Sequence, residues 1–238
     1  MLLATLIAGA VAMASMVPIE NFTLSLFGTI GYKYWAVALV AATHEELTKL
    51  LIVILIAVLV PKQFNDPMDG IVYGSIAGIG MAFSESLFHL SWSPEEEMFL
   101  PRGELVRLLA HPVMGGIGGF AIGMRCMKMH RWEWTLVACI TFVIAVHFLW
   151  DCIAIHAHYE GVGRWHSAGA IGLMLTGILV YGMLIVVGSD WSRKVFAPHT
   201  PCQLWGWPFT LFMNRPEYDP ERQLGRQNET KTKSRPDT

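Results

Sequence analysis

Residues 34–60 read YWAVALVAATHEELTKLLIVILIAVLV, and this stretch decides what kind of protein the chain forms. A membrane-spanning helix needs about 20 mostly apolar residues, so the stretch is long enough to cross a bilayer with some tilt or a bend. It nevertheless carries Glu45, Glu46 and Lys49 near its middle. Ionisable side chains at that depth are costly and need partners. The stretch therefore predicts a membrane helix whose charged groups face the interior of a bundle.

The composition of the whole chain agrees with an integral membrane protein. Of the 238 residues, 53% are hydrophobic and only 15% are charged, and the mean hydropathy is +0.44. Soluble domains carry about 25% charged residues, so this composition excludes a soluble enzyme and a disordered protein. The formal net charge of −2 gives no field that attracts a polyanion, so we expect no nucleic-acid partner.

Apolar stretches long enough to span recur along the chain, which predicts an all-α, polytopic membrane helix bundle with about six transmembrane helices. They cover roughly residues 2–18, 34–60, 68–90, 103–127, 133–157 and 166–188. The first has a signal-peptide feature, Ala-Met-Ala before Ser15, but no Lys or Arg precedes it, so we expect a retained helix. Residues 20–33 are less apolar and are compatible with a short interfacial or re-entrant segment.

The basic residues predict the orientation and a second region. Residues 1–189 are expected to form the bundle, and residues 190–238 a basic cytoplasmic tail, interfacial around 202–213 and disordered at its end. With the N-terminus inside, the inner connections and the start of the tail hold Lys62, Arg125, Lys128, Arg131, Arg193 and Lys194. The outer connections hold Lys33, Arg102 and Arg164, together with Glu95, Glu96 and Glu97. The positive-inside rule then places both termini in the cytoplasm.

Polar residues of four predicted spans fall at a similar depth in the outer half of the bilayer. At about 1.5 Å per residue, Glu45 lies about 16 Å, Glu85 about 8 Å, His111 about 12 Å and His147 about 15 Å from the outer ends. Scattered structural polar groups would not be expected to line up in this way. The shared depth predicts one polar site.

The facing of these residues supports the same site. Glu85 continues a face of small residues made by Gly70, Gly74 and Gly78, and such faces let helices approach closely. His111 begins a similar series, Gly115, Gly119 and Gly123. His147 and Asp151 are four residues apart and share a helix face. Single residues of this set also have structural interpretations. Lys49 could form an intrahelical ion pair with either glutamate, and either histidine could be a packing residue.

The sequence does not contain the HExxH zinc motif at His44. His44-Glu45 begins like the HExxH zinc motif, but Thr48 stands where the second histidine is required. His156, His158 and His166 lie near a predicted boundary of the membrane and are expected to be interfacial.

Four motifs together resemble the PrsW family of intramembrane proteases. Glu45-Glu46-x-x-Lys49 is similar to the first motif of that family, and the segment from Asp66 through Glu85 to the second. His111 with Gly119 is similar to the third, and His147-x-x-x-Asp151 to the fourth. The resemblance covers roughly residues 34–155, in the family's order. It implies an endopeptidase of a bacterial inner membrane that cleaves a single-pass membrane protein, such as an anti-sigma factor, near the outer face.

Peptide hydrolysis needs an activated water, a group that polarises the carbonyl and a proton for the leaving amine. We expect Glu45 to act as the base on water, with Glu46 and Lys49 orienting it. His111 would help to hold the water, and His147 with Asp151 would polarise the carbonyl.

A metal-dependent mechanism stays open, because His111, His147 and Glu85 make an adequate zinc ligand set. The pair of glutamates on one helix favours the metal-independent form. From another class of protein, a non-catalytic scaffold would use the same cluster as a packing network. A small transporter is disfavoured, because six helices are few and no inverted repeat is visible.

Overall fold

The computed structural model describes residues 1–92 and 102–196, and every regular element in these two ranges is a helix. In chain order they are α1 (Leu2–Ala14), α2 (Met16–Leu26), the short 3-10 helix η1 (Gly28–Tyr32), α3 (Tyr34–Leu59), α4 (Pro67–Trp92), α5 (Arg102–Cys126), α6 (Trp132–Glu160) and α7 (Arg164–Phe196). The prediction of an all-α membrane helix bundle is confirmed. The expectations for residues 95–97 and for the tail from residue 197 onward, including 202–213, lie outside the described residues.

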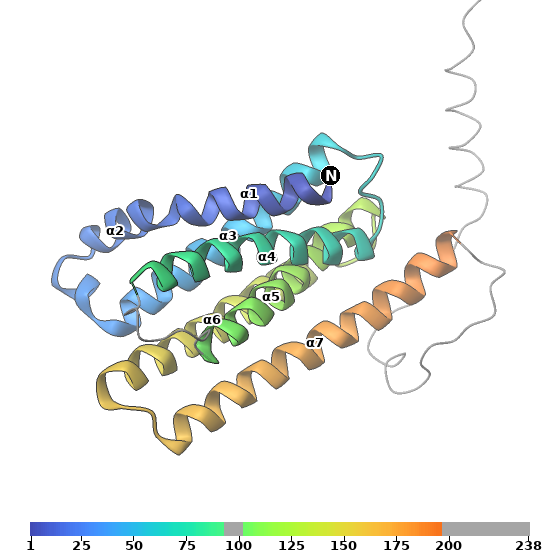
Figure 1. Ribbon diagram of the computed structural model, residues 1–238. Helices are drawn as coiled ribbons and strands as arrows, with labels where there is room; N and C mark the ends of the chain where they lie inside the picture. The colour runs from blue at the N-terminus through green and yellow to red at the C-terminus, as the bar shows by residue number, and fades with distance from the viewer. Residues whose placement is uncertain (93–101, 197–238) are drawn as a thin grey trace, which may run out of the picture.

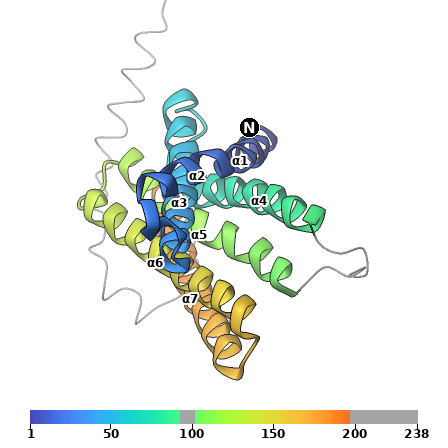
Figure 2. The ribbon, with the colours of Figure 1, turned by 90° about the vertical axis from the view of Figure 1, so that its left-hand side faces the viewer.

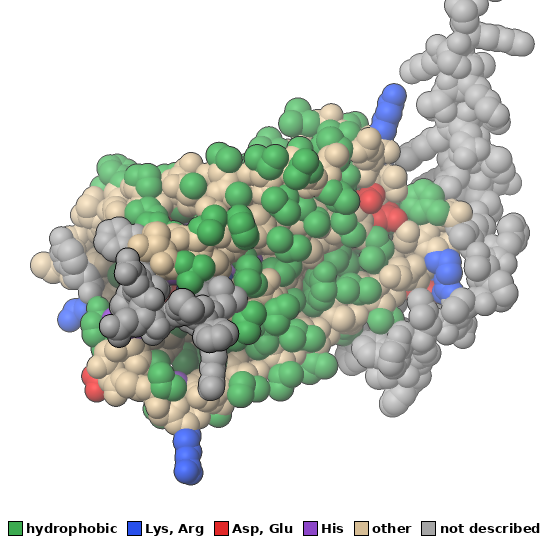
Figure 3. Space-filling model, in the orientation of Figure 1, with side chains coloured by type: hydrophobic (Ala, Val, Ile, Leu, Met, Phe, Trp, Pro, Cys, Tyr) green, Lys and Arg blue, Asp and Glu red, His purple; other side chains and the backbone are tan. Residues whose placement is uncertain are grey.

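The helices run back and forth, so that Met1 and the end of α7 lie at the same end of the bundle (Figure 1). Both views place α1 and α7 on opposite flanks, with α3, α4, α5 and α6 between them (Figures 1 and 2). Figure 3 shows hydrophobic side chains along the visible flank, whereas Lys and Arg side chains stand at the two ends. An apolar band between charged ends is the surface that a bilayer requires.

Four helices, α4 to α7, are long and apolar enough to cross a membrane. The bent pair α1 and α2 makes a fifth span if the two helices cross together. The predicted count of six also requires α3, which is long enough with 26 residues but carries three charged side chains. Those three side chains, Glu45, Glu46 and Lys49, are all buried in the bundle. The charges of α3 therefore face protein, as the sequence predicts.

The first helical stretch differs from the prediction. Instead of one helix ending near residue 18, α1 and α2 meet at Ser15 with a bend of 41°, and α2 continues to Leu26. Pro18 has no backbone N–H, so the helical hydrogen bond to Ala14 cannot form at this point. The Ser15 hydroxyl donates to the Val11 carbonyl at 2.9 Å, a backbone contact that favours bending. Residues 20–26 are α-helical, and the 3-10 helix η1 follows them.

The small-residue faces of α4 and α5 pack directly against each other. A Cβ added at Gly74 would overlap the carbonyl oxygen of Gly115, and one added at Gly115 would overlap that of Gly74. Gly70 and Gly119 are related in the same reciprocal way, and Gly78 lies against the carbonyl of His111. The two backbones thus touch over three helical turns, which confirms the packing predicted from the glycine spacing.

The start of α4 is fixed by a capping box. Asp66 accepts a hydrogen bond from the backbone N–H of Asp69 at 2.9 Å, while the Asp69 carboxylate accepts one from Asn65 N–H at 2.8 Å. Pro67, between them, fits the first helical position because its missing N–H would have no partner there. The hydroxyl of Ser192 on α7 also donates to Asp66 at 2.5 Å. The segment beginning at Asp66 therefore ties α7 to the start of α4.

Candidate active site

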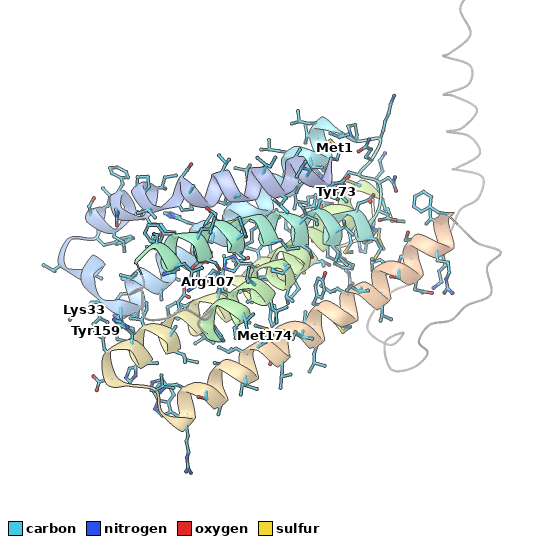
Figure 4. The ribbon with its side chains drawn as sticks, viewed as in Figure 1. Met1, Lys33, Tyr73, Arg107, Tyr159 and Met174 are labelled. Carbon is cyan, nitrogen blue, oxygen red and sulfur yellow. The ribbon has the colours of Figure 1, made fainter. Side chains whose placement is uncertain are left out.

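The polar residues predicted from the four motifs meet in one cluster between α3, α4, α5 and α6, in which Glu85 and Asp151 are partly exposed and the other members are buried. Its members are Glu45, Glu46, Lys49, Glu85, His111, His147 and Asp151. In Figure 4 the region is marked by Arg107, which lies nearer to the end of the bundle carrying Lys33 and Tyr159 than to Met1. With the predicted orientation, that end is the outer one.

Three side chains of the cluster point ligand atoms at one another. Oε2 of Glu45 lies 3.8 Å from Nε2 of His111 and 3.8 Å from Nε2 of His147. The two imidazole rings meet edge to face, with centroids 5.6 Å apart. All three ligand atoms lie within 4.8 Å of one another, and all three residues are buried. We refer to Glu45, His111 and His147 as the triad.

The triad fits a zinc ion. Zinc bonds of about 2.0–2.2 Å in a tetrahedral site place ligand atoms roughly 3.3 Å apart, close to the two glutamate–histidine distances of 3.8 Å. Oε2 of Glu45 is buried and has no hydrogen-bond partner in the described structure. An unpartnered buried carboxylate oxygen is costly unless an ion or a water completes it. The predicted ligand set was His111, His147 and Glu85; the structure brings Glu45 to both histidines, while Glu85 lies 3.1 Å from His111.

Glu85 is held beside the triad by Arg107 and two histidines. Its Oε1 atom lies 2.9 Å from Nε of Arg107, and its Oε2 atom lies 3.1 Å from Nε2 of His111. His89, one turn further along α4, is 3.5 Å from the same carboxylate. Arg107 was not among the predicted site residues, although its position four residues before His111 places both on one face of α5.

Glu46 orients a histidine rather than its neighbour Glu45. Nδ1 of His147 lies 2.7 Å from Oε1 of Glu46, and Nζ of Lys49 donates to the same oxygen at 2.6 Å. An ionised Glu46 keeps the imidazole proton on Nδ1, which leaves the lone pair of Nε2 directed at the triad. Carboxylate–histidine pairs of this kind commonly support metal-binding histidines. The expectation that Glu46 and Lys49 orient Glu45 finds no contact in the described structure.

Of the remaining predicted residues, Asp151 lies at the site, whereas His156 and His166 lie away from it. Oδ2 of Asp151 is 3.5 Å from Nε2 of His147, as their four-residue spacing predicts. His156 and His166 contact each other at the turn between α6 and α7, with Nδ1 and Nε2 3.0 Å apart. His156 lies nine residues beyond His147 on α6, which is about 14 Å along the helix axis.

The fold and the site define an all-helical integral membrane protein with a buried glutamate–histidine centre. The family model of the PrsW family intramembrane metalloprotease matches residues 1–188. The chain therefore belongs to the PrsW family of intramembrane metalloproteases, and it is an intramembrane protease. The match includes all seven residues of the cluster and extends beyond the four motifs to α1, α2 and most of α7. No curated protein and no solved structure matches the chain.

Proposed function

We propose that this protein is a zinc-dependent endopeptidase that hydrolyses a peptide bond of a single-pass membrane protein, with Glu45, His111 and His147 as the metal ligands. The observation that carries the proposal is the position of Glu45 Oε2, 3.8 Å from Nε2 of both histidines and without a hydrogen-bond partner among the described residues. The family's description as a metalloprotease supports a metal, against the metal-independent mechanism that the sequence favours.

The residues around the triad have separate tasks in this proposal. A zinc ion held there would act as a Lewis acid toward the scissile carbonyl and lower the pKa of the attacking water. Glu46 and Lys49 hold the proton of His147 on Nδ1, so that Nε2 stays available as a ligand. Arg107 pairs with Glu85, whose Oε2 lies 3.1 Å from Nε2 of His111, so this carboxylate stands beside the metal position. Burial of the triad excludes bulk solvent, which strengthens each of these interactions.

The resemblance to PrsW proteases supports a membrane-tethered anti-sigma factor as the substrate and a bacterial inner membrane as the location. Met1 and Phe196 lie at the same end of the bundle (Figure 1), and the positive-inside rule supports a cytoplasmic location for that end, which puts the site in the outer half of the membrane. Cleavage near the outer face follows from this placement.

The full chain, purified in detergent, provides the test. We expect close to one zinc per chain by elemental analysis, loss of zinc in His111→Ala and His147→Ala, and cleavage of a member of a panel of single-pass proteins on co-expression. Glu45→Gln should abolish both zinc binding and cleavage while thermal stability holds. Glu133→Gln, at an exposed glutamate of α6, is the matched control. Cleavage that survives prolonged chelation would instead establish Glu45 as the base of a metal-independent enzyme. Absence of cleavage, with both Glu45→Gln and Glu46→Gln unfolding the protein, would establish a scaffold.

A further inference from the structure

The helix α2 lies against α3 at the level of the active site. The Thr48 hydroxyl donates to the sulfur of Met16 at 3.9 Å, and Oγ1 of Thr23 lies 3.5 Å from Nε2 of His44. These two contacts show that α2 and α3 run antiparallel, with Met16 opposite Thr48 and Thr23 opposite His44. The stretch of α3 between them contains Glu45 and Glu46.

Glu20 stands between these two contacts on the same face of α2. It follows Met16 by four residues and precedes Thr23 by three, which are the spacings of one helix face. Glu20 therefore lies level with residues 44–48 of α3. Its carboxylate is close enough to Glu85, Asp151 and His147 to interact with them electrostatically. The match to the PrsW family includes this part of the chain.

The Glu20 carboxylate has no partner in the part of the chain that the structure describes. Its Oε1 atom is buried without a hydrogen bond, and the side chain takes part in no ion pair among those residues. A carboxylate oxygen shielded from solvent and lacking a donor is costly. Such a group is expected where a water, a substrate or a transferable proton meets it during function.

The other carboxylates of the site are already engaged. Glu46 accepts from Lys49 and His147, and Glu85 is held by Arg107 and His111. Glu45 belongs to the triad, and Asp151 lies 3.5 Å from Nε2 of His147. Peptide hydrolysis needs one further group that accepts a proton from water and returns it to the leaving amine. Glu20 is the carboxylate left for that task.

We propose that Glu20 is the proton-transfer residue of this peptidase, an inference that rests on the proposed function. As the oxygen of water bonds to the scissile carbonyl carbon, Glu20 accepts a proton from that water. When the carbon–nitrogen bond breaks, the same proton passes to the leaving nitrogen. Water is the only co-reactant, and Glu20 ends in its starting protonation state.

The experiment compares the wild type with Glu20→Gln, Glu20→Asp and the control Glu133→Gln, all as full chains. The substrate is a fluorescently labelled single-pass protein that the wild type cleaves. In Glu20→Gln we expect kcat to fall about 100-fold or more while KM stays within about twofold. Glu20→Asp should recover part of kcat, because it restores a carboxylate at the same position. Glu133→Gln should match the wild type.

Two readouts do not depend on turnover. Zinc content should stay unchanged in Glu20→Gln, whereas His111→Ala loses zinc. The labelled substrate should bind zinc-free Glu20→Gln with the same affinity as it binds the zinc-free wild type. A wild-type kcat in Glu20→Gln, a rise in KM alone or a loss of zinc would overturn the role of Glu20. A wild type that neither binds zinc nor cleaves any substrate would overturn the proposed function itself, and this inference with it.

Discussion

Nδ1 of His147 lies 2.7 Å from Oε1 of Glu46, and the same oxygen accepts a hydrogen bond from Lys49 at 2.6 Å. A single carboxylate oxygen on α3 therefore connects a histidine of α6 to a lysine one turn away on its own helix. The two adjacent glutamates consequently differ in their contacts. Glu45 contributes to the triad, whereas Glu46 supports one member of it.

Glu46→Gln should weaken zinc binding by about 10–100-fold, because a neutral amide no longer fixes the proton of His147 on Nδ1. Competition with a chromophoric chelator would measure the change. Glu133→Gln, which alters an exposed carboxylate at the start of α6, should leave the affinity unchanged. Equal zinc affinities for Glu46→Gln and the wild type would contradict the supporting role of Glu46.

Lys49→Met should lower the free energy of unfolding by about 3–5 kcal/mol, because it leaves the buried Glu46 carboxylate without its ammonium partner. Both residues are almost fully buried, with side-chain exposures of 2% for Lys49 and 1% for Glu46. The double change Lys49→Met, Glu46→Gln should regain much of the loss, since no buried charge is then unpaired. Unfolding in detergent, followed by circular dichroism, would measure both. A double variant no more stable than Lys49→Met would refute the pairing.

Much of the site could be predicted from the sequence because helices impose fixed spacings. The four-residue step from His147 to Asp151 and the glycine series before Glu85 placed these side chains on interior faces. The contact of Glu46 with His147 could not be predicted in this way. It depends on how α3 and α6 are rotated about their axes, and the spacing along one helix does not determine that rotation.

The contacts of Glu45 and Glu85 could not be predicted for a similar reason. Both glutamates lie at a suitable depth, and only the side chains around them distinguish their roles. Arg107 pairs with Oε1 of Glu85, whereas Glu45 lies beside His111 and His147. The bend at Ser15 was missed for a local reason, because hydropathy does not register the hydrogen bond that Pro18 removes.

Gly74→Ala should destabilise the protein by roughly 1–3 kcal/mol, because the new methyl group would overlap the carbonyl of Gly115. Gly172→Ala is the matched control on α7, where nothing lies within 4 Å of an added Cβ. We expect that control to unfold at the same temperature as the wild type or slightly above it, since alanine is the better helix former. Equal losses for both variants would show that the contact between α4 and α5 is unimportant.

A reporter fused after Thr238 should be cytoplasmic, and one inserted at Glu96 should be outside. The structure places Lys62 and Arg125 at the end of the bundle shared by Met1 and Phe196, and the positive-inside rule assigns that end to the cytoplasm. Paired phosphatase and fluorescent-protein fusions would report the two sides. An external reporter after Thr238 would reverse the orientation and move the site to the inner half of the membrane.

The reciprocal glycine contacts of α4 and α5 set the axial register of these two helices at the active site. Each turn of one helix is fitted to a turn of the other through Gly70 with Gly119, Gly74 with Gly115, and Gly78 with the carbonyl of His111. A slip by one turn, about 5.4 Å, would carry Glu85 away from His111, and in one direction it would bring Ala82 to the His111 carbonyl in place of Gly78. Glycines, which have no side chain of their own, therefore fix the separation of the Glu85 and His111 side chains.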